Sequence, residues 1–82
     1  AGLHLPHPVS IVIGSGSVIG KNLTLYQGCT IGNKRGYPTL QDGVTIYPNS
    51  VVVGNVTIGA HAVIGANSFV DRSLPPETTY RG

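Results

Sequence analysis

Aliphatic residues recur at every sixth position of this 82-residue chain, from Ile13 to Ile31 and again from Leu40 to Val70. Between Ile31 and Leu40 the step is nine, which corresponds to one repeat plus three inserted residues. A fixed short period is typical of a solenoid, in which each unit packs only on its neighbours and the whole stack buries a continuous core. The sequence therefore predicts a repetitive fold instead of a globule around one central core.

Each repeat carries a turn signal three residues after its aliphatic residue. The residues at this position are Gly16, Asn22, Gly28, Gly43, Asn49, Asn55, His61 and Asn67. Glycine adopts positive φ at no steric cost, and Asn and His are the side chains enriched there. We therefore expect a left-handed corner at each of these positions. Extrapolation of the period toward the N-terminus places His4 at a corner as well.

The residues between the corners predict short strands. A small or aliphatic residue, such as Cys29, precedes a largely β-branched position and then the aliphatic one, so that the three side chains point in, out and in. Three strands and three corners make one triangular coil, and stacked coils pair at about 4.8 Å. We therefore expect an all-β fold, a parallel β-helix of about four coils. Its outward positions include Val18, Val51 and Val63, which are more apolar than a solvated face requires.

Composition argues against several classes of protein. Five Lys and Arg against three Asp and Glu give a net charge of +2 without a basic run, so nucleic-acid binding is not expected. No stretch approaches the roughly 20 apolar residues of a membrane span, and the N-terminus lacks the order of a signal peptide. The single cysteine, Cys29, fits the core of a protein in a reducing compartment, and we expect a cytoplasmic location.

The pattern Ile-Gly-x-Asn/Gly-small-Val resembles the hexapeptide repeat of the left-handed β-helix acyltransferases over essentially residues 5–82. The resemblance implies a left-handed, single-stranded coil, an exception to the right-handed crossover rule. Residues 5–14 are similar to the stretch of serine acetyltransferases that carries their catalytic histidine. Residues 27–32, 64–70 and 74–79 also resemble that subfamily and the related polysaccharide O-acetyltransferases. The implied function is O-acetyl transfer from acetyl-CoA, most similar to that of serine acetyltransferase.

The same resemblance places His7 on the catalytic histidine. An alcohol is a weak nucleophile at neutral pH, and an imidazole with a pKa near ~6.5 can take its proton as it attacks a thioester carbonyl. The implied reaction is direct transfer in a ternary complex, with backbone N–H groups stabilising the oxyanion and no metal. The residue by itself leaves a second interpretation open, in which His7 is a polar residue of the first coil.

The resemblance also implies a site for coenzyme A, in the groove between adjacent helices and against backbone and small residues. The matching positions are Gly32, Pro48, Gly65 and Ala66, with Arg72 near the phosphates.

The inserted residues predict a loop at one corner, which the family uses to reach the neighbouring subunit. Lys34 and Arg35 are candidates to face phosphates or an acidic acceptor, or are solvated cations. Tyr37 stands where serine acetyltransferases present a second active-site histidine. Pro6 stands where those enzymes carry an aspartate immediately before the catalytic histidine. Tyr47 occupies a position that is commonly glycine, and either narrows the groove or lies outside it. These departures leave a sugar or polysaccharide hydroxyl open as the acceptor.

We expect one domain, residues 1–82, a β-helix acyltransferase domain without the N-terminal helical domain and C-terminal tail of the family. Its apolar outward face predicts a homotrimer with sites shared between neighbours. A noncatalytic β-helix scaffold and a zinc-dependent anhydrase are the alternatives from other classes. His61 is explained by its corner position, and the three histidines are not at metal-ligand spacing, so no metal site is expected.

Overall fold

The chain forms a parallel β-solenoid in a computed structural model that describes residues 3–6 and 10–81. His7 lies outside the described residues. The strands are β1 (Leu3–His4), β2 (Val12–Ile13), β3 (Val18–Ile19), β4 (Leu23–Leu25), β5 (Thr30–Gly32), β6 (Thr39–Leu40), β7 (Thr45–Ile46), β8 (Val51–Val53), β9 (Thr57–Ile58), β10 (Val63–Ile64), β11 (Phe69–Val70) and β12 (Thr79–Tyr80). The described part of the chain contains no helix, and thus none that could cross a membrane.

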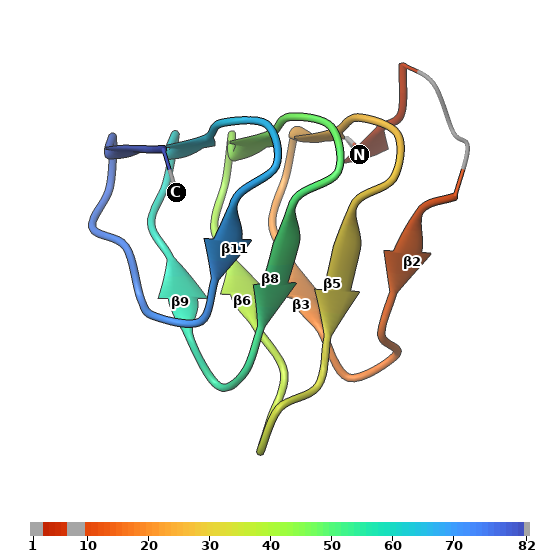
Figure 1. Cartoon of the computed structure of the whole chain (residues 1–82). Helices are drawn as coiled ribbons and strands as arrows, with labels where there is room; N and C mark the ends of the chain where they lie inside the picture. Colours follow the sequence, from red (N-terminus) through yellow and green to blue (C-terminus); the bar gives the residue numbers. More distant parts are fainter. Residues whose placement is uncertain (1–2, 7–9, 82) are drawn as a thin grey trace.

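Up to β11 every third strand joins the same sheet, and the three sheets form the faces of a triangular prism (Figure 1). β12 follows β10 in its sheet because Leu74, between them, forms only an isolated bridge to Ile58. The five-stranded sheet has the order β1-β4-β7-β10-β12, the four-stranded sheet β11-β8-β5-β2, and the three-stranded sheet β3-β6-β9. All printed pairings are parallel. The predicted all-β solenoid of about four coils is therefore confirmed.

Strand register reproduces the sequence period. Val12 pairs with Thr30, which is 18 residues later and therefore three repeats along the chain. Thr30 pairs with Val51, because the coil between them contains the three inserted residues. The loop formed by this insertion protrudes between β5 and β6 at the foot of Figure 1.

The period fails at the N-terminal end of the chain. His4 pairs with Thr24, a separation of 20 residues instead of 18. Two extra residues between β1 and β2 move His4 out of the extrapolated corner and into a strand. The prediction of a corner at His4 is therefore wrong.

The core fills the interior of the prism with the residues at the two inward positions of each repeat. Its buried apolar members are Leu23, Leu25, Cys29, Ile31, Leu40, Val44, Ile46, Val52, Val56, Ile58, Ala62, Ile64, Val70 and Leu74. The first coil is less enclosed, since Ile11, Ile13 and Ile19 are only partly buried. Burial of small and branched side chains in stacked layers explains how the chain builds a core with a single Phe and no Trp or Met.

Two of the three corners of each coil adopt the predicted left-handed conformation. Positive φ occurs at Asn22, Gly28, Gly43, Asn49, His61 and Asn67, as expected from the repeat, and also at Ser10 and Glu77. Gly16 and Asn55 lack it, and these two predictions are wrong. Both lie on the corner between the four-stranded and three-stranded sheets, where the insertion loop and Gly54, with a φ of 96°, replace the regular turn.

Candidate functional site

The described candidate residues lie along both edges of the four-stranded sheet. Pro48, Gly65 and Ala66 lie on its corner with the five-stranded sheet, which we call the tyrosine corner because Tyr26 and Tyr47 also lie there. The remaining candidates lie on its corner with the three-stranded sheet, which we call the loop corner. They are Gly32, Lys34, Arg35, Tyr37 and Arg72. The predicted coenzyme A contacts are thus divided between two corners of one chain, with Gly32 and Arg72 at the loop corner and the other three at the tyrosine corner.

Gly32 and Gly65 differ from the other described glycines, because neither has a left-handed φ and at neither would a Cβ come within 3.0 Å of another residue. A Cβ on Gly32 would have its nearest contact at 3.5 Å, to Val53. A Cβ on Gly65 would lie 3.3 Å from the carbonyl oxygen of Tyr80, which is tight but not a severe overlap. At each remaining described glycine, either φ is positive or the Cβ would come within 3.0 Å of another residue. These two glycines are the two predicted to contact coenzyme A.

The backbone at Gly65 is held from inside the coil by two buried serines. The hydroxyls of Ser50 and Ser68 both donate to the Gly65 carbonyl oxygen, at 2.9 and 2.7 Å. Ser50 also accepts the backbone N–H of Ser68 at 3.2 Å. Buried hydroxyls that are fully used in this way fix the backbone they contact. The backbone of the tyrosine corner is therefore held in place at Gly65, a residue without a side chain.

Tyr26 and Tyr47 stack on successive coils of the same corner. Their ring centroids are 5.0 Å apart and the rings are nearly parallel, at 17°. Tyr47 is 39% exposed. Strand register places Tyr47 directly before Pro48 and on the coil next to Gly65, two of the predicted coenzyme A contacts.

The insertion loop is ordered by local hydrogen bonds and carries two exposed cations. The side-chain oxygen of Asn33 accepts the N–H of Gly36 at 2.9 Å, and Arg35 adopts a left-handed φ of 60°. Lys34 lies 3.7 Å from the carboxylate of Asp71, which follows β11, two coils further along. Both side chains are well exposed, so this pair contributes at most about 1 kcal/mol and leaves Lys34 available for an anion.

Tyr37 folds back from the loop onto the preceding coil. A Cβ added to Gly14 or Gly16 would overlap its ring, so these two glycines form the surface on which the ring lies. Pro38, which follows it, is buried. Tyr37 thus covers the first coil, a contact that the repeat pattern did not indicate.

Cys29 is a core residue, as predicted. Its side chain is fully buried, and its thiol lies 3.3 Å from the carbonyl oxygen of Tyr47. Burial raises the pKa of the Cys29 thiol, an effect that backbone N–H groups partly oppose. A neutral, enclosed thiol is not a nucleophile.

No group of three or more His, Cys, Asp and Glu within residues 3–6 and 10–81 is arranged to hold a metal ion. His61 lies at a left-handed corner with its ring over Gly43, which accounts for its presence.

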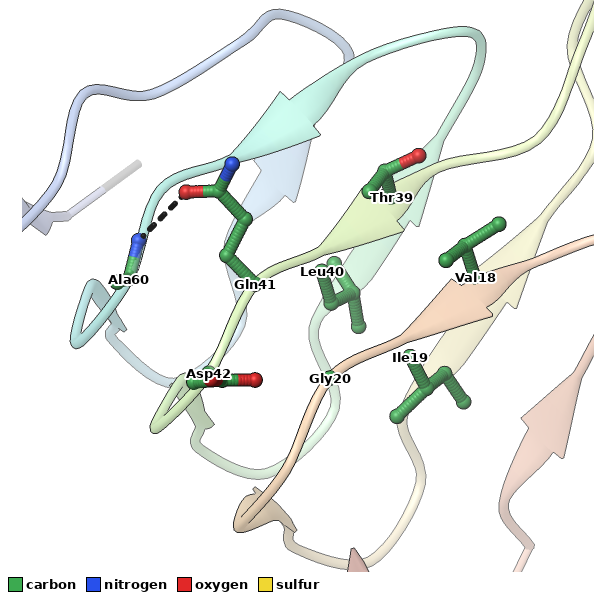
Figure 2. Close-up of a pocket in the computed structure, with 8 residues that line it drawn as sticks. All are labelled: Val18, Ile19, Gly20, Thr39, Leu40, Gln41, Asp42 and Ala60. Carbon is green, nitrogen blue, oxygen red and sulfur yellow. Dashed lines mark hydrogen bonds between the residues drawn. The ribbon is translucent and has the colours of Figure 1, made fainter.

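A hollow of about 420 Å³ lies elsewhere, on the three-stranded sheet, and contains none of the predicted residues (Figure 2). Its apolar floor includes Val18 and Leu40, and its rim carries Gln41 and Asp42. The Gln41 side chain accepts the N–H of Ala60, and Asp42 accepts the N–H of Lys21. These contacts brace neighbouring coils and engage both polar side chains of the rim, so we place the candidate active site at the four-stranded sheet instead.

Sequence reasoning missed Ser50, Ser68 and the partnership of Tyr26 with Tyr47. The signal was present in the spacing. The serines occupy the same inward position one coil apart, and the tyrosines occupy the same corner position across the insertion. Arranging the repeats by coil, in addition to by position, would have found both pairs.

The comparisons with known proteins agree on one class. Residues 37–72 match the family model "Bacterial transferase hexapeptide (six repeats)". Serine acetyltransferase of Staphylococcus xylosus is 42% identical over 98% of this chain. The crystal structure of Neisseria gonorrhoeae serine acetyltransferase in complex with serine superposes on 99% of the chain, with a TM-score of 0.94 and 39% identity. A serine acetyltransferase structure in complex with CoA superposes on 94% of this chain, with a TM-score of 0.90 and 35% identity.

Fold and repeat together define the class of this protein: it is a left-handed parallel β-helix with a hexapeptide repeat, and residues 37–72 of it match the bacterial transferase hexapeptide model. Within that class its similarity is to the serine acetyltransferases, as the motifs predicted. The chain spans 39% of the length of the S. xylosus enzyme and 35% and 33% of the two solved chains.

Proposed function

We propose that this β-helix is the acetyl-transfer domain of an acetyl-CoA-dependent O-acetyltransferase of the serine acetyltransferase type. The observation that carries the proposal is the pair Gly32 and Gly65, which have neither a left-handed φ nor a Cβ position within 3.0 Å of another residue and which coincide with predicted coenzyme A contacts. The similarity to a serine acetyltransferase solved with CoA and to another solved with serine supports it.

In the proposed reaction, His7 acts as the general base. It takes the proton of the acceptor hydroxyl while the oxygen forms a bond to the acetyl carbonyl carbon. The resulting oxyanion is stabilised by backbone N–H groups, and it collapses with cleavage of the carbon–sulfur bond. The proton on His7 then passes to the departing CoA thiolate, so that the products are the acetyl ester, free CoA and neutral histidine.

The loop corner supplies positive charge for the phosphates of coenzyme A. Lys34, Arg35 and Arg72 are all exposed there, and together they are three of the five basic residues of the chain. Asp71 offsets only part of this charge. A basic surface of this kind favours a phosphorylated co-substrate by long-range attraction.

Serine is the acceptor that the comparisons favour. A sugar or polysaccharide hydroxyl is the second candidate, because Pro6 and Tyr37 stand where the related enzymes carry groups linked to serine recognition. The Tyr37 ring lies over Gly14 and Gly16, and this position of the ring favours an acceptor pocket of altered shape.

The proposed enzyme is a cytoplasmic homotrimer. Its four-stranded sheet presents an outward row of Val12, Thr30, Val51 and Phe69, of which Val12 and Phe69 are more than half exposed. Association through this face would bury the row and place both edges of the sheet beside neighbouring subunits. The unpaired, buried Cys29 suits a reducing compartment.

The test is release of free CoA from acetyl-CoA with L-serine or a sugar as acceptor, for the wild-type chain, His7→Ala and the matched control His4→Ala. His4 is an exposed strand residue three positions from His7. We expect His7→Ala to lower kcat by about 10²- to 10⁴-fold with unchanged CoA binding, and His4→Ala to retain activity. Equal rates for all three would remove His7 from the mechanism, and absence of CoA binding would favour a noncatalytic scaffold.

A further inference from the structure

We propose that Tyr47, Gly65 and Arg81 form a stacking subsite for the adenine ring of a nucleotide. The identity of the ligand as coenzyme A rests on the proposed function, whereas the subsite itself rests on the geometry of the tyrosine corner.

The subsite is part of a column of equivalent positions along the tyrosine corner, one on each successive coil. Strand register aligns Tyr26, Tyr47, Gly65 and Arg81 on four successive coils, because each follows a paired residue of β4, β7, β10 or β12. Tyr26 covers one face of the Tyr47 ring. On the other side of Tyr47 the next position of this corner is Gly65, which has no side chain to stack on the ring.

Gly65 leaves space of the right thickness for a flat ring. Adjacent coils are about 4.8 Å apart, so a ring inserted at the level of Gly65 would lie at about that distance from Tyr47. Aromatic rings stack favourably with centroids roughly 4.5–7 Å apart. The bound ring would continue the spacing that Tyr26 and Tyr47 already establish at 5.0 Å.

Arg81 closes the upper side of this space. Its Cγ lies 3.6 Å from the position that a Cβ on Gly65 would occupy, and the side chain is exposed. Among the described residues its guanidinium has no hydrogen bond or ion pair. A guanidinium stacks well on aromatic faces and attracts phosphate, so it suits the upper side of a nucleobase.

The floor of the subsite is preorganised. Ser50 and Ser68 hold the Gly65 carbonyl oxygen from the interior, so the backbone at this level does not need to be ordered when a ligand binds. A Cβ at Gly65 would lie 3.3 Å from the backbone oxygen of Tyr80, and φ at Gly65 is not in the left-handed region. A partly exposed aromatic ring, a position without a side chain and a cation with no partner among the described residues thus meet at one rigid point.

The experiment compares two halves of coenzyme A. Adenosine 3′,5′-bisphosphate carries the ring and phosphates, and S-acetylpantetheine carries the thioester without the ring. Affinity for CoA and for the bisphosphate is measured by calorimetry for the wild type, Tyr47→Ala, Tyr47→Phe, Gly65→Val and Arg81→Ala. Lys21→Ala, which removes an exposed cation at another corner, is the control for Arg81→Ala.

We expect Tyr47→Ala to weaken binding of CoA and of the bisphosphate by about 5- to 150-fold, the range for loss of one base–aromatic stack. Tyr47→Phe should restore binding, since the ring is kept, and Gly65→Val should block it. Arg81→Ala should weaken both ligands more than Lys21→Ala does.

Unchanged affinity of Tyr47→Ala and Gly65→Val for both ligands would overturn the subsite even if acetyl transfer is observed. Conversely, bisphosphate binding that depends on Tyr47, in a protein that transfers no acetyl group from acetyl-CoA or S-acetylpantetheine, would retain the subsite and refute the proposed function. Tighter binding of CoA than of the bisphosphate would indicate that the subsite serves the adenine of CoA. Tighter binding of the bisphosphate would indicate that it serves the adenine of a free nucleotide.

Discussion

At the scale of single residues, the glycines separate into those that the coil needs and those that it leaves open. Gly28 has a φ of 73° and lies under the Asn49 side chain, whereas Gly32 has ordinary φ and free space. The sequence showed both as glycine and could not distinguish them. The distinction depends on what the neighbouring coil places above each residue, which only the three-dimensional structure reveals.

The first prediction follows from this difference. Gly28→Ala should lower the free energy of unfolding by about 1–2 kcal/mol or more, because alanine is strained at positive φ and its methyl group overlaps Asn49. Gly32→Ala should change it by no more than about 0.5 kcal/mol. Urea denaturation followed by circular dichroism measures both, and equal losses would contradict the assignment of the left-handed corners.

A second prediction concerns Cys29 and pH. Burial raises the pKa of its thiol above the ordinary value of 9.0, so the folded state favours the protonated form. This contribution to stability is complete below that value and is lost as the pH rises through the higher pKa of the folded state. The unfolding free energy of the wild type should therefore fall more steeply above pH 9 than that of Cys29→Ala. Parallel pH profiles would show that the buried thiol does not titrate in this way.

At the scale of elements, the repeat predicted the strands and most corners, because each six-residue unit uses the same backbone conformation. It failed at His4, Gly16 and Asn55, where two residues are added or the loop corner loses its regular turn. Such irregularities depend on contacts between coils, and a local pattern does not contain them. The loop-corner half of the candidate site lies at irregular positions of this kind, whereas Pro48, Gly65 and Ala66 lie at a corner with the regular left-handed turn.

The insertion loop allows a prediction about one element. Tyr37→Ala should expose Gly14 and Gly16 and loosen the first coil, which is the least enclosed part of the core. Backbone amide exchange should then accelerate at Gly14 and Ser17, whose N–H groups donate to Ile31 and Gly14, while amides of β8 and β10 remain protected. Tyr37→Phe keeps the ring and should exchange as the wild type does. Uniform acceleration along the chain would indicate a global loss of stability instead.

At the scale of the whole molecule, the outward apolar row of the four-stranded sheet predicts assembly. Each chain has a mass of 8.5 kDa, and sedimentation equilibrium should report a particle of three chains. Val51→Asp, on that row, should dissociate it, because a carboxylate cannot be buried there without a partner. Val18→Asp, on the exposed three-stranded sheet, is the matched control and should leave the trimer intact. A wild-type monomer at micromolar concentration would exclude sites shared between subunits.

The class of fold could be predicted from the sequence because the period extends over nearly the whole chain. Cofactor contacts could be named only through the resemblance, and the structure then divided them between two corners of one sheet. The stack of Tyr26 on Tyr47 and the serine pair beneath Gly65 complete the candidate site with residues of this chain that the family pattern did not indicate.

The central claim, that coenzyme A binds along the four-stranded sheet, is tested most directly by titrating the isotopically labelled chain with CoA and following its backbone amide resonances. The account predicts saturable shifts at Gly32, Gly65 and Ala66, with the amides of the hollow near Val18 and Asp42 unmoved. The absence of saturable shifts at those three residues, or shifts confined to the hollow, would contradict it.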